Sequence, residues 1–281
     1  MVTADEEKTV SNAFKLSLIS ISAALYAVAI SLTAFIPTPW GVGSFRPGVL
    51  VPAFFALIYG PLVGGLGAAL GCFIGDLVQS VFGLTTPLLS LVAGVPGNFV
   101  GFFLLGLLVK KYRSWGAFTI SSFVSLLVGN AVCAIGVVGY LSAFSVQPFA
   151  SMSMDIKLGT IFGFTFFWVG TMIPFVIPLM PAVLRVVNPV LSANKGNLEI
   201  SEITWGKTTG TLKSTIFVSL VLAGLYAIVM FTPLGDIIFS GAVTGGSVYT
   251  YWVKTLMLIA SAVVIAFGIA VTVLLQRKKI S

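Results

Sequence analysis

The chain has no histidine and very little charge. Only 8% of its 281 residues are Asp, Glu, Lys or Arg, against about 25% in soluble domains. Without histidine, neither a His-ligated metal site nor a His proton relay can form. Cysteine is scarce too. Cys72 and Cys133 both lie in apolar runs, which favours two small buried side chains over a disulfide framework or a thiolate zinc site.

Apolar sequence is abundant instead. Hydrophobic residues make up 58% of the chain, and the mean hydropathy is +1.10. A water-soluble fold cannot bury this much apolar surface, so the bilayer must act as the solvent. Eight apolar runs predict an all-α polytopic membrane protein with about eight transmembrane helices. The runs cover residues 15–36, 48–59, 61–79, 86–109, 116–140, 158–184, 213–233 and 251–275.

The excess of basic over acidic residues indicates membrane orientation rather than a nucleic-acid surface. If the N-terminus is cytoplasmic, only Arg46, Lys157 and Lys254 of the 15 Lys and Arg residues fall outside. This bias follows the positive-inside rule and predicts both termini in the cytoplasm. The first run follows acidic residues 5–7 and is long enough to span, so we expect no cleaved signal peptide. The cytoplasmic residues are then Lys8, Lys15, Lys110, Lys111, Arg113, Arg185, Lys195, Lys207, Lys213, Arg277, Lys278 and Lys279.

Two opposite charges, Arg46 and Asp76, bracket 29 residues without any charge. A single helix of that length would measure about 44 Å, too long for a hydrocarbon core of about 30 Å. Because Gly60-Pro61 is a turn signal, we predict a hairpin with a short first helix and both charges at the outer face. The two residues either pair and lock the hairpin or face a ligand, and a pair can also wall a pocket. A small-xxx-small packing seam is predicted at Gly67, Gly71 and Gly75.

Further polar side chains are expected in the outer half of the membrane. The helical rise places Asn130 at about the depth of Asp76, and Asn98 somewhat deeper. Asn98 follows Gly94–Gly97 (GVPG), interpreted as a helix interruption of the kind tolerated along a cavity. These residues predict a polar pocket, although each asparagine could instead serve helix packing, and Trp168 could belong to the core. The candidate substrate-binding residues are Arg46, Asp76, Gln79, Asn98, Asn130 and Trp168.

The order of these motifs resembles the substrate-binding S components of energy-coupling-factor (ECF) transporters. In that family a Gly-Pro turn precedes a Gly-rich helix that ends in Gly-Asp, as Gly60-Pro61 and Gly75-Asp76 do here. The next helix is also similar, because it starts with an asparagine and has a basic end, in NFVGFFLLGLLVKK (Asn98–Lys111). The resemblance covers the six-helix core, at about residues 15–187.

The resemblance implies a function as well as a fold. An S component captures a vitamin or similar small molecule near the outer face of a prokaryotic plasma membrane. It needs no cofactor or metal and is not an enzyme, because a separate transmembrane subunit and two ATPases drive transport. The chain has no Gly-x-x-x-x-Gly-Lys-Ser/Thr phosphate loop of its own. Ala23 and Ala27 are similar to the small-residue motif with which these subunits dock on their transmembrane partner.

The chain departs from the six-helix family after the sixth run. We expect a substrate-binding core at residues 1–190, a polar cytoplasmic linker at 191–212 and a two-helix extension at 213–281. The main alternative is a stand-alone secondary transporter or permease for a small molecule. Such a protein usually needs an ion-coupling carboxylate near mid-membrane. Asp76 is the one candidate for that role and is predicted to lie too close to the outer face. An intramembrane enzyme is disfavoured because a catalytic dyad is hard to assemble without histidine, and a structural subunit is a further alternative.

Overall fold

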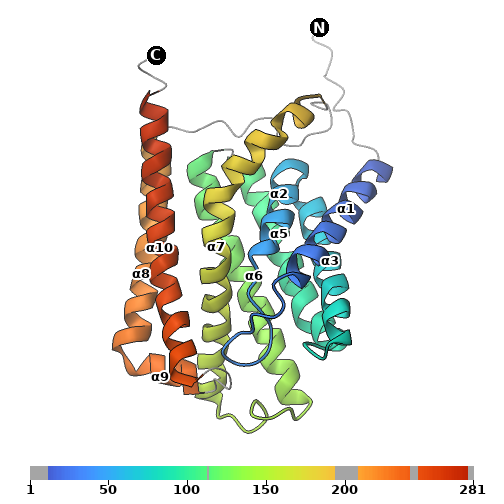
Figure 1. Cartoon of the computed structure of the whole chain (residues 1–281), viewed down its shortest axis with the longest axis vertical. Coiled ribbons are helices and arrows are strands. Elements are labelled where there is room, and N and C mark those ends of the chain that lie inside the picture. The colour runs from blue at the N-terminus through green and yellow to red at the C-terminus, as the bar shows by residue number, and fades with distance from the viewer. Residues whose placement is uncertain (1–11, 113, 194–207, 241–245, 278–281) are drawn as a thin grey trace.

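The computed structural model describes residues 12–112, 114–193, 208–240 and 246–277, and helices dominate them (Figure 1). Several basic residues used for the orientation (Lys8, Arg113, Lys195, Lys207, Lys278, Lys279) and most of the predicted linker lie outside these ranges. The helices are α1 (Asn12–Ser31), α2 (Leu50–Tyr59), α3 (Pro61–Val81), α4 (Pro87–Leu89), α5 (Val95–Tyr112), α6 (Trp115–Ala143), α7 (Met154–Ala193), α8 (Thr208–Phe231), α9 (Pro233–Ser240) and α10 (Gly246–Arg277).

Each of the eight predicted apolar runs coincides with one helical segment. Within the described ranges, seven segments are long and apolar enough to cross a membrane, and the eighth, Pro47–Tyr59, is shorter. The prediction of an all-α polytopic membrane protein is therefore confirmed, including the short first arm of the hairpin. The short helix α9 between α8 and α10 was not predicted.

The hairpin turns at Gly60 and Pro61, between α2 and α3. Gly60 has φ +89°, a left-handed conformation that a residue with a Cβ rarely adopts. Pro61 begins α3, where the missing backbone N–H has no helical partner to lose. The chain reverses here, so the start of α2 and the end of α3 lie at the same end of the bundle (Figure 1). This geometry brings Arg46 and Asp76 within reach of each other.

The segment after α3 keeps its helical form where an interruption was predicted. Residues Ser90–Gly94 form a π-helical turn that joins α4 to α5, and Gly94–Gly97 continue into α5. The interruption is therefore a local widening of the helix rather than a break. A π turn shifts the backbone hydrogen bonds by one residue, which accommodates Pro96, a residue without an N–H to donate.

Helix α1 packs tightly against α3 along the glycines of the small-xxx-small pattern. A Cβ at Gly71 would lie 2.7 Å from the carbonyl oxygen of Ala23, and one at Gly75 would overlap the side chain of Ile30. A Cβ at Gly67 would lie 2.5 Å from the hydroxyl oxygen of Ser22. In lipid, where no hydrophobic force drives helices together, such close backbone approach supplies the packing energy.

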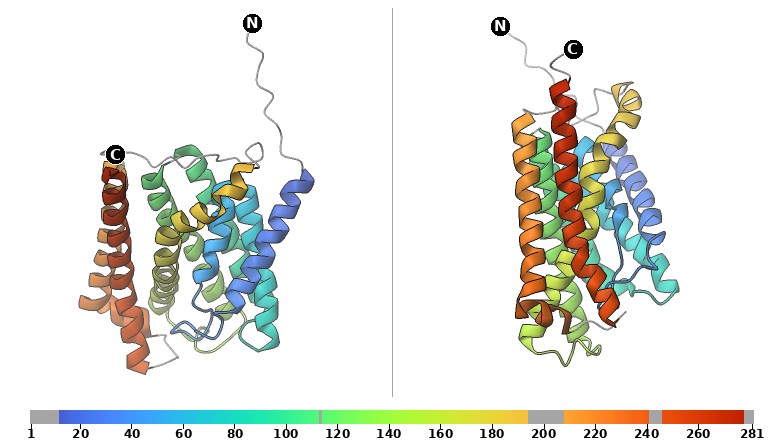
Figure 2. Two further views of the ribbon diagram at one scale, coloured as in Figure 1. Left: turned by 45° about the horizontal axis from the view of Figure 1, so that its top comes forward. Right: turned by 60° about the vertical axis from the view of Figure 1, so that its left-hand side comes forward.

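The bundle consists of a core, α1 to α7, and a C-terminal group, α8 to α10. In Figure 1 and both views of Figure 2, α8 and α10 form an antiparallel pair at the opposite side of the molecule from α1. The pair packs on α6 and α7, and α9 packs on α7. The first turn of α1 and the last turn of α10 lie at the same end of the bundle, at the top of Figure 1.

Candidate functional site

A loop between α1 and α2, residues 32–46, lies toward the end of the core opposite the start of α1 (the blue loop in Figure 1). We call it the lid loop. An isolated antiparallel bridge joins Pro37 to Ser44, and the Thr38 hydroxyl donates a hydrogen bond to the Val42 carbonyl oxygen (2.7 Å). Gly43, which has φ +75°, completes the tight turn. The folded loop presents Val42 and Gly43 to a cavity beneath it.

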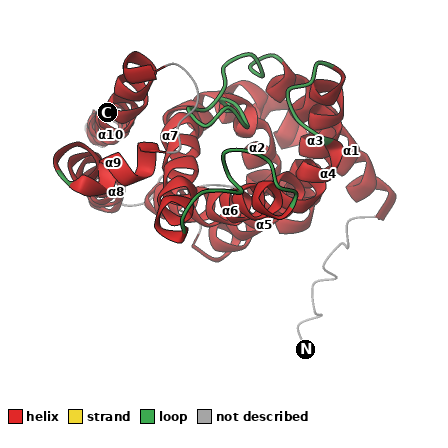
Figure 3. Ribbon diagram, turned by 90° about the horizontal axis from the view of Figure 1, so that it is seen from below, coloured by secondary structure: helices red, strands yellow, loops and turns green. Residues whose placement is uncertain are grey.

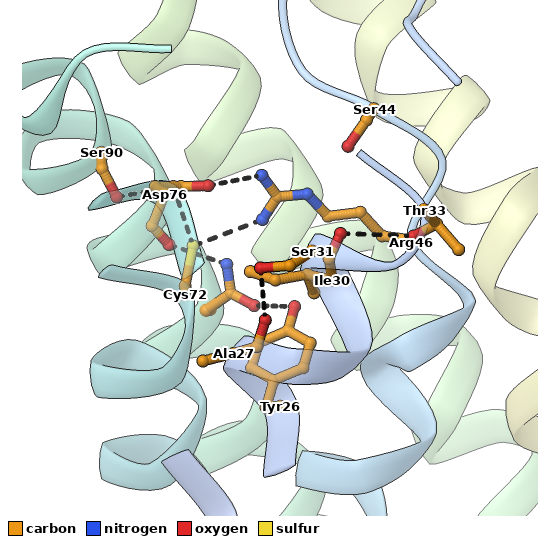
Figure 4. A network of polar contacts seen from close by, with 12 residues as sticks. Tyr26, Ala27, Ile30, Ser31, Thr33, Ser44, Arg46, Cys72, Asp76 and Ser90 are labelled. Atoms are coloured by element: carbon orange, nitrogen blue, oxygen red, sulfur yellow. Dashed lines mark hydrogen bonds and ion pairs between the residues drawn. The ribbon is translucent and has the colours of Figure 1, made fainter. Parts of the chain in front are cut away.

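An ion pair between Arg46 and Asp76 lies at the edge of this cavity (Figure 4). Arg46 Nη2 is 3.1 Å from Asp76 Oδ1, and the two side chains are 12% and 4% exposed. Arg46 Nη1 also donates to Cys72 Sγ (3.3 Å). The second carboxylate oxygen accepts hydrogen bonds from Ser90 Oγ (2.6 Å) and Cys72 Sγ (3.4 Å). Both charges are thus paired and hydrogen-bonded, as burial requires.

A second polar contact joins α1 to α5. The hydroxyl of Tyr26, which is completely buried, donates to Asn98 Oδ1 (2.8 Å). Asn98 Nδ2 in turn donates to the carbonyl oxygen of Gly94 in the π-helical turn (2.8 Å). Tyr26 and Asn98 therefore satisfy each other's buried polar groups and fix the spacing of their helices.

Two small cavities lie next to each other in the core, and Cys133 lines both. The lid cavity, about 30 Å³, is lined by Arg46, Asp76, Ser90 and Trp168 together with Val42 and Gly43 of the lid loop. The amide cavity, about 20 Å³, is lined by Asn98, Ser125, Asn130 and Met172 between α5, α6 and α7. Each volume holds one or two water molecules, so a larger ligand must displace side chains or the lid loop.

The amide cavity contains polar groups that are only partly satisfied. Asn130 Nδ2 donates a weak hydrogen bond to the Met172 sulfur (3.3 Å). Ser125 is 1% exposed, and its hydroxyl has no hydrogen-bond partner among the described residues. A buried polar group without a partner costs free energy, so a ligand or a water at this place would be stabilised.

The comparisons with known proteins identify the family. A family model described as ECF-type riboflavin transporter, S component, matches residues 11–169, which is more than half of the 281-residue chain. The chain belongs to this family. No curated protein and no solved structure matches it.

Membership of the S-component family supports the coarse function predicted from the motifs. The protein is a membrane subunit that binds a substrate for vitamin uptake, and S components are transport subunits rather than enzymes. The match ends at residue 169, inside α7, so the C-terminal group of α8 to α10 lies outside it.

The S component brings five of the six predicted substrate-binding residues to the two cavities. Arg46, Asp76 and Trp168 line the lid cavity, and Asn98 and Asn130 line the amide cavity. The sixth, Gln79, is buried on α3 one turn beyond Asp76, but it lines neither cavity, and its Nε2 has no partner among the described residues. Their roles in binding stay predictions.

Ala23 and Ala27, predicted to dock on a partner subunit, lie inside the packed seam between α1 and α3. Their side chains are 3% and 6% exposed, and their carbonyl oxygens face Gly71 and Gly75. A partner could contact them only if α1 moved away from α3. The sequence pattern did not show this, because apolar residues surround α1 and only the glycines of α3 decide which face is buried.

Sequence reasoning missed several residues that complete the site. Tyr26, Ser90, Ser125 and Met172 were not predicted, and Cys72 was predicted only as a small buried side chain. Cys72 precedes Asp76 by four residues on α3, and this spacing places two side chains on one helix face. That signal was available in the sequence. Met172 follows Trp168 by four residues on α7, so the same signal was available for Met172. Tyr26, Ser90 and Ser125 have no such spacing to a predicted binding residue, so the sequence pattern did not reveal them.

Proposed function

We propose that this S component binds riboflavin, or a closely related neutral flavin, in the region of the lid cavity and the amide cavity. One observation carries the proposal. The segment that matches the riboflavin S-component model, residues 11–169, contains the lid loop and all five predicted residues that line the two cavities. Movement of the lid loop would enlarge the combined space for a tricyclic ring and its side chain.

The electrostatics of the lid cavity favour a neutral ligand. Arg46 is the cation that lines the cavity, and Asp76 neutralises it at 3.1 Å. An anionic ligand would have to compete with this carboxylate, and like charges placed together cost several kcal/mol. Riboflavin has hydroxyls and an imide edge that can exchange hydrogen bonds with Ser90, Asn98 and Asn130 while its ring buries apolar surface.

Purified protein should therefore quench the fluorescence of riboflavin in a saturable titration. Riboflavin 5′-phosphate should bind about tenfold or more weakly, because its charged phosphate meets Asp76 rather than a free cation. Equal or tighter binding of the phosphate ester would mean that Arg46 leaves Asp76 to hold the ligand. Absence of saturable riboflavin binding would overturn the substrate assignment while leaving the family assignment in place.

We further propose that the core at residues 1–190 binds the substrate while a transmembrane coupling subunit and two ATPases drive its uptake. Family membership supports such partners in general. Because Ala23 and Ala27 are buried, a partner would contact the exposed side of α1, where Leu25 and Val28 are 52% and 61% exposed. The two C-terminal helices leave this side of the core uncovered (Figure 3).

The proposed orientation places the lid loop outside the cell and both termini in the cytoplasm. A cysteine at Ser151, in the exposed loop before α7, should react with a membrane-impermeant maleimide added to intact cells. A cysteine at Lys111, in the exposed last turn of α5, should react only after the cells are opened. The parent protein measures the background from Cys72 and Cys133. The reverse pattern would place the lid loop in the cytoplasm and exclude capture from outside.

The alternative of a secondary transporter lacks a suitable carboxylate among the described residues. Ion coupling needs an acidic group that can bind and release its ion. Asp76 is 3% exposed and already accepts hydrogen bonds from Arg46, Ser90 and Cys72. Asp155 and Asp236 lie near helix starts at the lid-loop end of the bundle. The arrangement of charges therefore supports a binding subunit.

A further inference from the structure

Helix α9, outside the matched family segment, packs on two glycines of α7. A Cβ at Gly159 would lie 2.9 Å from Ile237 Cγ2 and 3.1 Å from the Ile237 carbonyl oxygen. One at Gly163 would lie 3.0 Å from Ile238 Cγ2. The two glycines are four residues apart and so share one face of α7. Because glycine has no side chain, this face of α7 lets the short helix α9 lie close to the α7 backbone.

The lid loop packs against the same face of α7, at Gly163. A Cβ at Gly163 would overlap the ring of Trp40, whose Cη2 atom would lie 2.5 Å away. Trp40 is 1% exposed and Ile238 is 3% exposed, and both belong to the main buried cluster. The lid-loop tryptophan and the α9 isoleucine therefore both pack against Gly163, although the two residues are almost 200 positions apart in the chain.

Trp40 connects the region around Gly163 to the lid cavity through a row of aromatic rings. Its ring centroid lies 4.7 Å from that of Phe164, and Phe164 lies 5.1 Å from Trp168, which it stacks on. Trp168 lines the lid cavity and donates from Nε1 to the lid-loop carbonyl oxygen of Ser44 (3.1 Å). A Cβ at Gly43 would lie 2.7 Å from the Trp168 ring. A shift of Trp40 would therefore be transmitted to the cavity wall.

We propose that α9 is a positioning element of the substrate site, which holds the lid loop closed by packing Ile238 beside Trp40. This inference rests on the proposed function, because it assumes that the lid cavity receives the substrate. Opening the lid loop must remove Trp40 from its buried position and expose apolar surface. Ile238 and Trp40 both lie against Gly163 in the closed arrangement. Opening would remove Trp40 from the buried cluster to which Ile238 also belongs, so Ile238 stabilises closure. A six-helix core without α9 would lack this contact.

The test compares Ile238→Ala with Leu234→Ala in the full-length protein. Leu234 lies on the same helix but is 40% exposed, so it controls for a general effect of shortening an α9 side chain. Without any ligand, Ile238→Ala should raise amide hydrogen exchange across residues 33–45, because the gap beside Trp40 favours lid opening. Leu234→Ala should leave that exchange unchanged. This measurement does not depend on the identity of the substrate.

Riboflavin provides the second measurement. Ile238→Ala should raise the riboflavin dissociation rate about tenfold, equivalent to about 1.4 kcal/mol, and change the association rate little. A role limited to fold stability would instead lower the melting temperature with no change in either rate. The conservative variant Ile238→Leu, which keeps the side-chain volume, should restore slow dissociation.

Three results would overturn the proposal. They are equal lid-loop exchange in Ile238→Ala and Leu234→Ala, an unchanged riboflavin dissociation rate in Ile238→Ala, and a rate in Ile238→Leu as high as in Ile238→Ala. If the wild-type protein does not bind riboflavin, the substrate assignment fails, and the ligand-free exchange still decides whether α9 holds the lid loop.

Discussion

Arg46→Ala should lower the free energy of unfolding by about 3–5 kcal/mol, the usual cost of removing one member of a buried ion pair. Asp76 is 3% exposed in the parent protein, and without Arg46 its carboxylate would keep only Ser90 and Cys72 as partners. Neither of these carries a positive charge, so the buried negative charge would be uncompensated. The melting temperature in detergent, or urea unfolding where it is reversible, measures the effect.

The double variant Arg46→Met with Asp76→Asn tests whether the uncompensated charge of Asp76 causes this loss. It removes both charges and keeps the volumes similar, and the introduced amide could still accept the Ser90 hydrogen bond through its carbonyl oxygen. Much of the lost stability should return, because replacing a whole buried pair by neutral groups is often nearly neutral. A double variant as unstable as Arg46→Ala would show that an uncompensated Asp76 charge is not the cause of the loss, and that the hydrogen bonds of the guanidinium to Asp76 and Cys72 are.

Ligand binding by the same variants distinguishes the two roles considered for Arg46. The sequence left open whether Arg46 faces a ligand or pairs with Asp76. In the structure, both terminal nitrogens already contact protein atoms, Asp76 Oδ1 and Cys72 Sγ. We therefore expect the double variant to retain most of its riboflavin affinity. A loss of binding that the double replacement does not restore would return Arg46 to the role of ligand anchor.

The hairpin and its ion pair were predictable because both depend on local features. Helix length, the Gly60-Pro61 turn and the rarity of charge in lipid suffice to bring Arg46 and Asp76 to one end of the membrane. The structure then adds the distance between them, 3.1 Å. The predicted interruption at Gly94–Gly97 was less accurate. Glycine and proline indicate irregular backbone, but here the irregularity is a π-helical turn, which keeps the helix continuous.

Contacts between helices that are distant in the chain could not be predicted in the same way. The hydrogen bond from Tyr26 to Asn98 joins α1 to α5. The packing of Ile238 and Trp40 against Gly163 brings α9 and the lid loop to the same part of α7. Each depends on the rotation of a helix about its axis. In a soluble protein, the polar face of a helix shows in the sequence which side points to solvent. Here nearly every helix is apolar on all sides, so the sequence does not show this rotation. Small residues at the helix contacts set it instead. The burial of Ala23 and Ala27 has the same origin.

Gly129→Ala, at the contact between α5 and α6, should lower both the stability of the protein and its affinity for riboflavin. The new Cβ would lie 2.8 Å from both the Gly101 Cα and the Gly97 carbonyl oxygen. These are backbone atoms, which cannot move aside as a flexible side chain can, so the two helices must separate. Overpacking of this kind costs about 1–3 kcal/mol. Because Gly97, Gly101 and Gly129 all line the amide cavity, separation should also reposition Asn98 and Asn130 and weaken riboflavin binding.

Gly139→Ala is the matched control, because Gly139 lies on the same helix with nothing within 4 Å of a Cβ added there. Alanine is favoured over glycine inside a helix by about 0.5–1 kcal/mol, so this variant should melt at the same temperature as the parent or slightly higher. Gly129→Ala should melt lower and bind riboflavin less tightly in the same assays. If both variants match the parent in stability and affinity, α5 and α6 do not meet through their glycine backbones. If Gly129→Ala loses stability but keeps its affinity, the amide cavity takes no part in binding the flavin, and the substrate lies against the lid cavity alone.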